Sequence, residues 1–133
     1  MTEANEYGGA YHLLIFILLF LNICVSPALA ENANNSAALD EKVRMFLASR
    51  RGEWVDWNVP DVDGKILYDL IIKNHYQKAV EIGTSTGHSA VWIAWVLSKT
   101  GGKLITIEID KGRHQEALAN FEKAGLSDFI NPN

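Results

Sequence analysis

The sequence predicts an α/β fold built on a parallel sheet, and the order of its segments supports this prediction. Short apolar runs typical of strands alternate with longer runs whose apolar residues recur at helical spacing. Strict alternation of this kind indicates parallel strands joined by crossover helices. In order along the chain, the segments are the strand 78–82, the helix 89–98, the strand 103–109 and the helix 112–124.

Two amphipathic helices are expected before the sheet. The first has apolar residues at helical spacing within 39–47 and ends before Gly52. The second spans 62–73, and Asp61 is its expected N-cap. We expect both helices to pack their apolar faces on the sheet.

Turn chemistry marks both ends of the last predicted helix. Asp110 precedes this helix as its N-cap, and Gly125 follows it as a left-handed C-cap. Leu126 is the hydrophobic residue that usually accompanies such a cap. Residues 129–130 would begin a third strand, and we expect the chain to stop there in mid-fold.

Composition limits the function classes. The 133 residues are 48% hydrophobic and 21% charged, as in a globular chain with at most one domain. The formal net charge is −4 with both signs interspersed, so no basic stripe is present and we expect no nucleic-acid partner. Cys24 is the only cysteine and lies in the apolar segment, so the residues after it can form neither an internal disulfide nor a thiolate metal site.

Residues 1–30 are predicted to be a signal peptide, followed by a polar linker at 31–36 and the folded domain at 37–133. The apolar core at 13–25 has signal-peptide length and is short for a membrane span, and Ala28-Leu29-Ala30 supplies a cleavage site. Export to the periplasm or the exterior follows. The segment before the core has no Lys or Arg, so an uncleaved membrane anchor, a misassigned start and a buried helix stay as alternatives.

The two strand ends carry the pattern expected of an adenosine-type cofactor site. Gly83 and Gly87 enclose a loop of small residues directly after the first strand, where backbone can approach a ligand closely. Glu108 lies near the end of the second strand, where a carboxylate can accept hydrogen bonds from both hydroxyls of a ribose. Ligands bind at the carboxyl ends of such strands.

The residue sequence of the loop distinguishes a dinucleotide from S-adenosyl-L-methionine as the cofactor. A dinucleotide fingerprint that starts at Gly83 would require glycine where Ser85 and His88 stand. Glu81 instead gives the pattern E-x-G-x-x-x-G, which suits a ligand that has an amino-acid end and no pyrophosphate. This pattern favours S-adenosyl-L-methionine over a nicotinamide dinucleotide.

Three consecutive blocks of the sequence resemble the catechol and caffeoyl-CoA type O-methyltransferases. They are 57–65 (WNVPDVDGK), 81–89 (EIGTSTGHS) and 104–110 (LITIEID), in the family's order and approximate spacing. The resemblance implies a Rossmann-like class I methyltransferase fold, cut off after the second βα unit. It also implies transfer of a methyl group from S-adenosyl-L-methionine to a hydroxyl oxygen of a small-molecule acceptor.

The resemblance also implies roles for individual residues at the cofactor. Val59 and Gly83 would line it, and Glu81 would lie near its methionine end. Ser89 would hydrogen-bond its carboxylate, and Glu108 would hold its ribose. The complete set of implied cofactor-binding residues is Val59, Glu81, Gly83, Ser85, Gly87, Ser89 and Glu108.

Other parts of the family's active site are not expected in this chain. In the family, the metal-binding aspartates, the adenine-contacting segment and the catalytic base lie beyond the third strand. We therefore expect no catalytic residue and no metal ligand here, and a divalent cation only in a longer protein. Trp57 would border the methyl donor. Homo-oligomerisation stays open.

Structural interpretations compete with the functional ones. The loop 83–87 could form only a tight turn, Ser89 could be a first-turn helix residue, and Glu108 could pair with a neighbouring lysine on the surface. For the whole chain, two alternatives remain besides the methyltransferase. They are a non-catalytic module that binds S-adenosylmethionine or a nucleoside, and a Rossmann-like NAD-dependent oxidoreductase.

Overall fold

The structure is a computed structural model that describes residues 26–54 and 57–133. The chain divides into two compact units, 1–33 and 34–133. The apolar core of the predicted signal peptide lies outside the described residues, so the signal peptide stays a prediction. Within the described ranges, no helix has both the length and the apolar composition that a membrane crossing requires.

Helix α2 (Pro27–Ser49) is longer than the sequence suggested. It includes 31–36, so the expectation of a linker there is wrong at the level of local structure. Alanine and glutamate favour helix, and no glycine or proline interrupts the chain between Ala28 and Ser49. Only its later turns carry buried side chains, which are Val43, Phe46 and Leu47.

Helix α3 (Asp61–Asn74) begins one residue earlier than expected, and Asp61 is not its N-cap. Pro60 occupies that position without a side-chain hydrogen bond. The Asp61 carboxylate instead lies 2.9 Å from Nε2 of His88. The tertiary contact therefore replaces the local cap that the sequence predicted.

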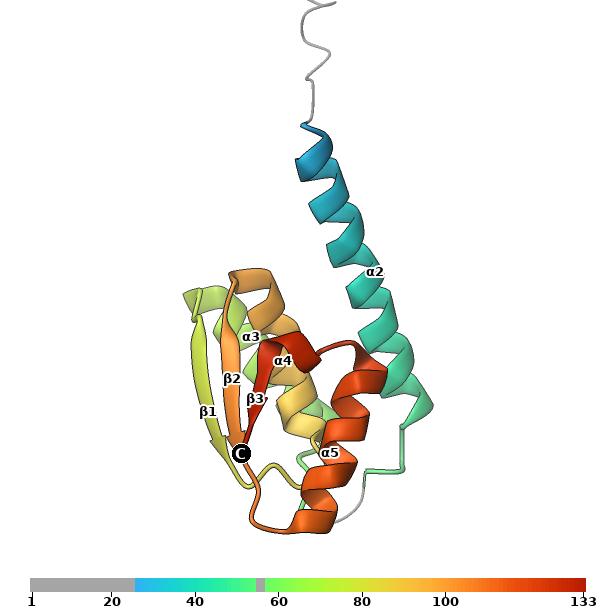
Figure 1. Ribbon diagram of the computed structural model, residues 1–133, viewed down its shortest axis with the longest axis vertical. Helices are drawn as coiled ribbons and strands as arrows, with labels where there is room; N and C mark the ends of the chain where they lie inside the picture. Colours follow the sequence, from blue (N-terminus) through green and yellow to red (C-terminus); the bar gives the residue numbers. More distant parts are fainter. Residues whose placement is uncertain (1–25, 55–56) are drawn as a thin grey trace, which may run out of the picture. The chain divides into compact units, whose positions relative to one another are not determined.

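Three parallel strands form the sheet in the order β1 (Lys78–Ile82), β2 (Lys103–Ile107) and β3 (Ile130–Pro132). Figure 1 shows them side by side. Strand β2 ends two residues before the predicted end. Glu108 therefore lies just beyond the strand, where its backbone N–H donates to the carbonyl oxygen of Asn133 at 2.9 Å.

Helices α4 (His88–Thr100) and α5 (Lys111–Ala124) follow β1 and β2. The predicted caps of α5 are confirmed. Asp110 accepts a hydrogen bond from the Arg113 backbone N–H at 2.8 Å, and Gly125 adopts the left-handed conformation. A short 3₁₀ turn, η1 (Ser127–Phe129), leads into β3.

The two faces of the sheet differ in burial. Leu104 and Thr106 of β2 are buried on the face that α4 packs against. The opposite face leaves Val80 66% and Ile82 84% exposed. On the covered side, Gly64 of α3 lies so close to Trp92 of α4 that a Cβ atom there would be 2.3 Å from the indole.

Candidate cofactor-binding site

The loop between β1 and α4 turns sharply at the carboxyl end of the sheet. The backbone N–H groups of Gly83 and Thr84 both donate to the carbonyl oxygen of Ile107, at 2.9 and 3.2 Å, so the loop is tied to the end of β2. Gly83 has a φ of +89°, and its missing Cβ would meet no atom within 4 Å. The loop therefore offers open space beside its backbone at Gly83, as close approach of a ligand requires.

Gly87 closes the loop for a different reason. It has a φ of +96°, and a Cβ there would lie 2.6 Å from the Phe121 ring of α5. Ser85, between the two glycines, also has a positive φ of +51°. Gly87 thus serves helix packing, whereas Gly83 faces free space.

Glu81 lies on β1, and its side chain connects this strand to α4 and β2. Its carboxylate accepts hydrogen bonds from the Ser89 hydroxyl at 2.5 Å and from the Thr106 hydroxyl at 2.6 Å. Thr106 also lies 2.6 Å from the hydroxyl of Thr84. Burial raises the pKa of Glu81, and the two donated hydrogen bonds oppose that shift without cancelling it.

Glu108 stands beyond β2 and holds the loop from the other side. Its two carboxylate oxygens accept the backbone N–H groups of Asp110, at 2.9 Å, and of Ser85, at 2.7 Å. The hydrogen bond from Asp110 is the largest cause that lowers the pKa of Glu108, and burial opposes it. Its hydrogen-bond partners are therefore backbone groups of the loop and of the next turn, not a neighbouring lysine.

Val59 is connected to the loop through His88, a residue to which the sequence analysis assigned no role. The carbonyl oxygen of Val59 lies 2.6 Å from Nδ1 of His88. Beside it, the Asn58 amide donates to the Thr86 hydroxyl at 2.9 Å. Trp57, by contrast, is 90% exposed. No sequence pattern marked His88, because its partners come from distant segments.

The structure thus brings the predicted cofactor-binding residues together at one end of the sheet. The loop residues and the two carboxylates are connected directly by hydrogen bonds, and Val59 is connected to them through His88. None of these contacts tests the predicted cofactor roles, which stay predictions. The residues in this arrangement are Val59, Glu81, Gly83, Ser85, Gly87, Ser89 and Glu108.

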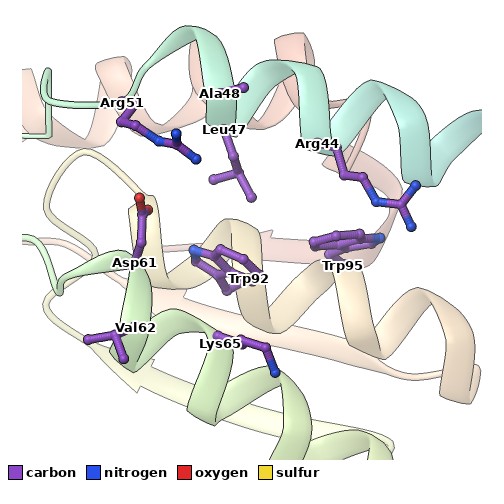
Figure 2. A pocket seen from close by; sticks show the side chains of 9 residues that line it. All are labelled: Arg44, Leu47, Ala48, Arg51, Asp61, Val62, Lys65, Trp92 and Trp95. Carbon is purple, nitrogen blue, oxygen red and sulfur yellow. The ribbon is translucent and has the colours of Figure 1, made fainter.

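A separate groove of about 600 Å³ lies among α2, α3 and α4. Figure 2 shows Trp92 and Trp95 along it, with Asp61 directed into it from α3. This groove lacks the glycine loop and both carboxylates of the candidate site. Asp61 and Trp92 also contact His88, so the groove adjoins the candidate site through this histidine.

Comparisons with known proteins identify the family of the chain. A family model described as O-methyltransferase matches residues 30–132. The chain belongs to this O-methyltransferase family. A catechol O-methyltransferase from Niastella koreensis is 38% identical over 67 residues, which cover 50% of this chain and 30% of that protein. A caffeoyl-CoA O-methyltransferase from Populus kitakamiensis is 26% identical over 124 residues, covering 89% and 52%.

A solved structure agrees at the level of the fold. The O-methyltransferase from Bacillus cereus in complex with SAH is 29% identical, with a TM-score of 0.57 over 73% of this chain and 42% of that one. The predicted Rossmann-like methyltransferase fold is thereby confirmed. The chain spans about a third to a half of the length of the curated relatives it matches.

Proposed function

We propose that this chain supplies the cofactor-binding half of a methyltransferase that uses S-adenosylmethionine and methylates a hydroxyl oxygen of a small molecule. One observation carries the proposal. Two carboxylates, Glu81 and Glu108, enclose a glycine loop with open space at Gly83, at the carboxyl ends of adjacent parallel strands. The catechol and caffeoyl-CoA names of relatives support the reaction class, and the SAH-bound neighbour supports the cofactor.

Glu108 is suited to hold a ribose. A carboxylate has about four lone-pair sites, and the two backbone N–H groups use only two of them. The remaining sites can accept the two vicinal hydroxyls of the ribose. Because its pKa is lowered, the side chain is ionised at neutral pH, which is the state that accepts both hydrogen bonds.

Glu81 and Ser89 are suited to the amino-acid end of the cofactor. A nearby ammonium group would favour the ionised form of Glu81 and oppose the effect of burial on its pKa. The Ser89 hydroxyl has one proton, which it donates to Glu81 in this structure. To donate to a cofactor carboxylate instead, it must rotate away from Glu81.

The bound cofactor would supply an electrophilic methyl group on a sulfonium sulfur. The chain's own contribution is to bind and orient this cofactor, because positioning for in-line transfer accounts for much of such catalysis. Among the described residues, no three His, Cys, Asp or Glu side chains gather as a metal site would require.

The alternative cofactor fits the geometry less well. A dinucleotide fingerprint needs glycine at the position of His88, and this side chain is buried against Trp54 with both ring nitrogens in hydrogen-bond range of partners. A non-catalytic module that binds S-adenosylmethionine uses the same site. It differs from the methyltransferase only in lacking transfer activity.

The test compares Glu108→Ala with Asp110→Ala in calorimetric titrations with S-adenosylmethionine, S-adenosylhomocysteine and NAD. Loss of the ribose hydrogen bonds should cost about 1.5–3 kcal/mol, or one to two decades in Kd. Asp110→Ala removes the α5 cap and should lower stability by about 1 kcal/mol, with affinity nearly unchanged. Equal affinity of wild type and Glu108→Ala for both adenosyl ligands would contradict the ribose role, and preference for NAD would contradict the function.

A further inference from the structure

His88 is the first residue of α4, and its side chain is only 1% exposed. The Trp54 indole stacks on the imidazole with ring centroids 4.4 Å apart and an interplanar angle of 20°. Both ring nitrogens also lie within hydrogen-bond distance of polar atoms from other segments. A buried ring with this many polar partners does more than fill space, since an apolar residue of the same size would pack without them.

The partners determine where the ring carries its proton. The Val59 carbonyl oxygen, 2.6 Å from Nδ1, can only accept, so Nδ1 must donate. Nε2 lies 3.2 Å from the Trp92 indole nitrogen, which can only donate, and 2.9 Å from the Asp61 carboxylate, which accepts. A neutral ring accepts from Trp92, and a charged ring donates to Asp61. The hydrogen bond from Nδ1 to Val59 exists in both states.

This hydrogen bond connects the segment before α3 to His88, the residue that directly follows the glycine loop. A second side-chain hydrogen bond runs from the Asn58 amide to the Thr86 hydroxyl at 2.9 Å. The Asn58 carboxamide oxygen also lies 3.5 Å from the His88 backbone N–H, at the limit of a hydrogen bond. The position of Val59 relative to the loop therefore depends on the His88 side chain.

We infer that His88 is a positioning residue for the cofactor, because its Nδ1–H holds the Val59 carbonyl and fixes the 58–60 segment against the loop that begins at Gly83. This inference rests on the proposed function. It goes beyond it by assigning cofactor affinity to a side chain that has no predicted contact with the ligand. His88 acts through Val59, and the adjoining Asp61 and Trp92 orient its ring.

Two substitutions in the 133-residue chain separate positioning from packing. His88→Asn places an amide N–H where Nδ1 stood, so it retains the donor to Val59 and loses the stack on Trp54. His88→Phe retains the stack and loses the donor. His114→Phe, on α5 and away from this contact, is the matched control.

Calorimetry with S-adenosylhomocysteine and thermal unfolding are measured on each variant. We expect His88→Phe to weaken binding about three- to tenfold, because one hydrogen bond is lost. The affinity of His88→Asn for S-adenosylhomocysteine should stay within about twofold of wild type. Its melting temperature should nevertheless be lower than that of His88→Phe, because it loses the stack on Trp54. A residue with a packing role alone would give the opposite order, with affinity following the melting temperature, and that result would overturn the inference.

Hydrogen exchange in the ligand-free chain distinguishes failure of this inference from failure of the proposed function. Amides of residues 58–64 should exchange faster in His88→Phe than in wild type, and His88→Asn should resemble wild type. If wild type does not bind S-adenosylhomocysteine, the proposed function fails, and the exchange pattern alone decides the role of His88. Unchanged exchange in His88→Phe would refute it.

Discussion

Gly64→Ala tests how closely α3 and α4 pack. In an exposed helix interior, alanine stabilises by about 1 kcal/mol relative to glycine. Here the added Cβ would lie 2.3 Å from Trp92 Cδ1 and 2.4 Å from its Nε1. The indole has little room to move, because it donates to His88 at 3.2 Å and packs 5.5 Å from the Trp95 ring. The packing penalty therefore opposes the helix propensity.

The magnitudes decide the sign. Overpacking costs about 1–3 kcal/mol, and loss of the hydrogen bond from Trp92 to His88 adds about 1 kcal/mol. After subtracting about 1 kcal/mol for helix propensity, we expect Gly64→Ala to lower the free energy of unfolding by about 1–3 kcal/mol. Urea unfolding followed by far-ultraviolet circular dichroism, at low protein concentration, measures this change without relying on tryptophan fluorescence.

Two further variants test the physical cause. Gly112→Ala in α5 is the control, because its Cβ would lie 3.3 Å from the end of the Asp110 side chain, and stability should stay level or rise slightly. In a Trp92→Leu background, Gly64→Ala should cost at least about 1 kcal/mol less than in wild type, since the clashing ring is gone. If Gly64→Ala stabilises the chain as Gly112→Ala does, the close packing of the two helices is refuted.

Three other predictions concern separate parts of the chain. Burial raises the pKa of Glu81, so its stabilising contribution is complete below the ordinary glutamate pKa and is lost as the pH rises through the raised value. Glu81→Gln should therefore gain stability relative to wild type between about pH 4 and pH 7, and parallel urea-stability profiles would contradict this. The chain from Glu31 onward should self-associate through its exposed sheet face. The double variant with threonine at Val80 and Ile105 should therefore associate less than the wild-type chain in sedimentation experiments. Equal association of the wild-type chain and this variant would exclude the face. We also propose export through the N-terminal segment, so intact mass should show a mature protein that begins at Glu31, whereas a retained Met1 in the exported or membrane fraction would refute cleavage.

The sequence predicted the local features of the fold well, because near neighbours in the chain determine them. Strand β1 occupies the predicted residues, and the caps at Asp110 and Gly125 form as expected. Capping depends on backbone groups within one helical turn, so a short pattern is sufficient to predict it. The cap predicted at Asp61 is wrong for the complementary reason, since its carboxylate contacts His88 from a different segment.

In the candidate site, too, some features follow from residue order and others only from the tertiary structure. The sequence alone determined that a glycine loop follows β1 and that acids stand beside it and after β2, because residue order places these groups at the ends of parallel strands. Only the tertiary structure decided that the Glu108 carboxylate accepts a hydrogen bond from the Ser85 backbone N–H and that the Ser89 hydroxyl donates to Glu81. The same holds for His88 and Val59, which lie 29 residues apart in sequence and 2.6 Å apart in space. Contacts between distant segments follow from how whole elements pack, and no local pattern in the chain encodes them.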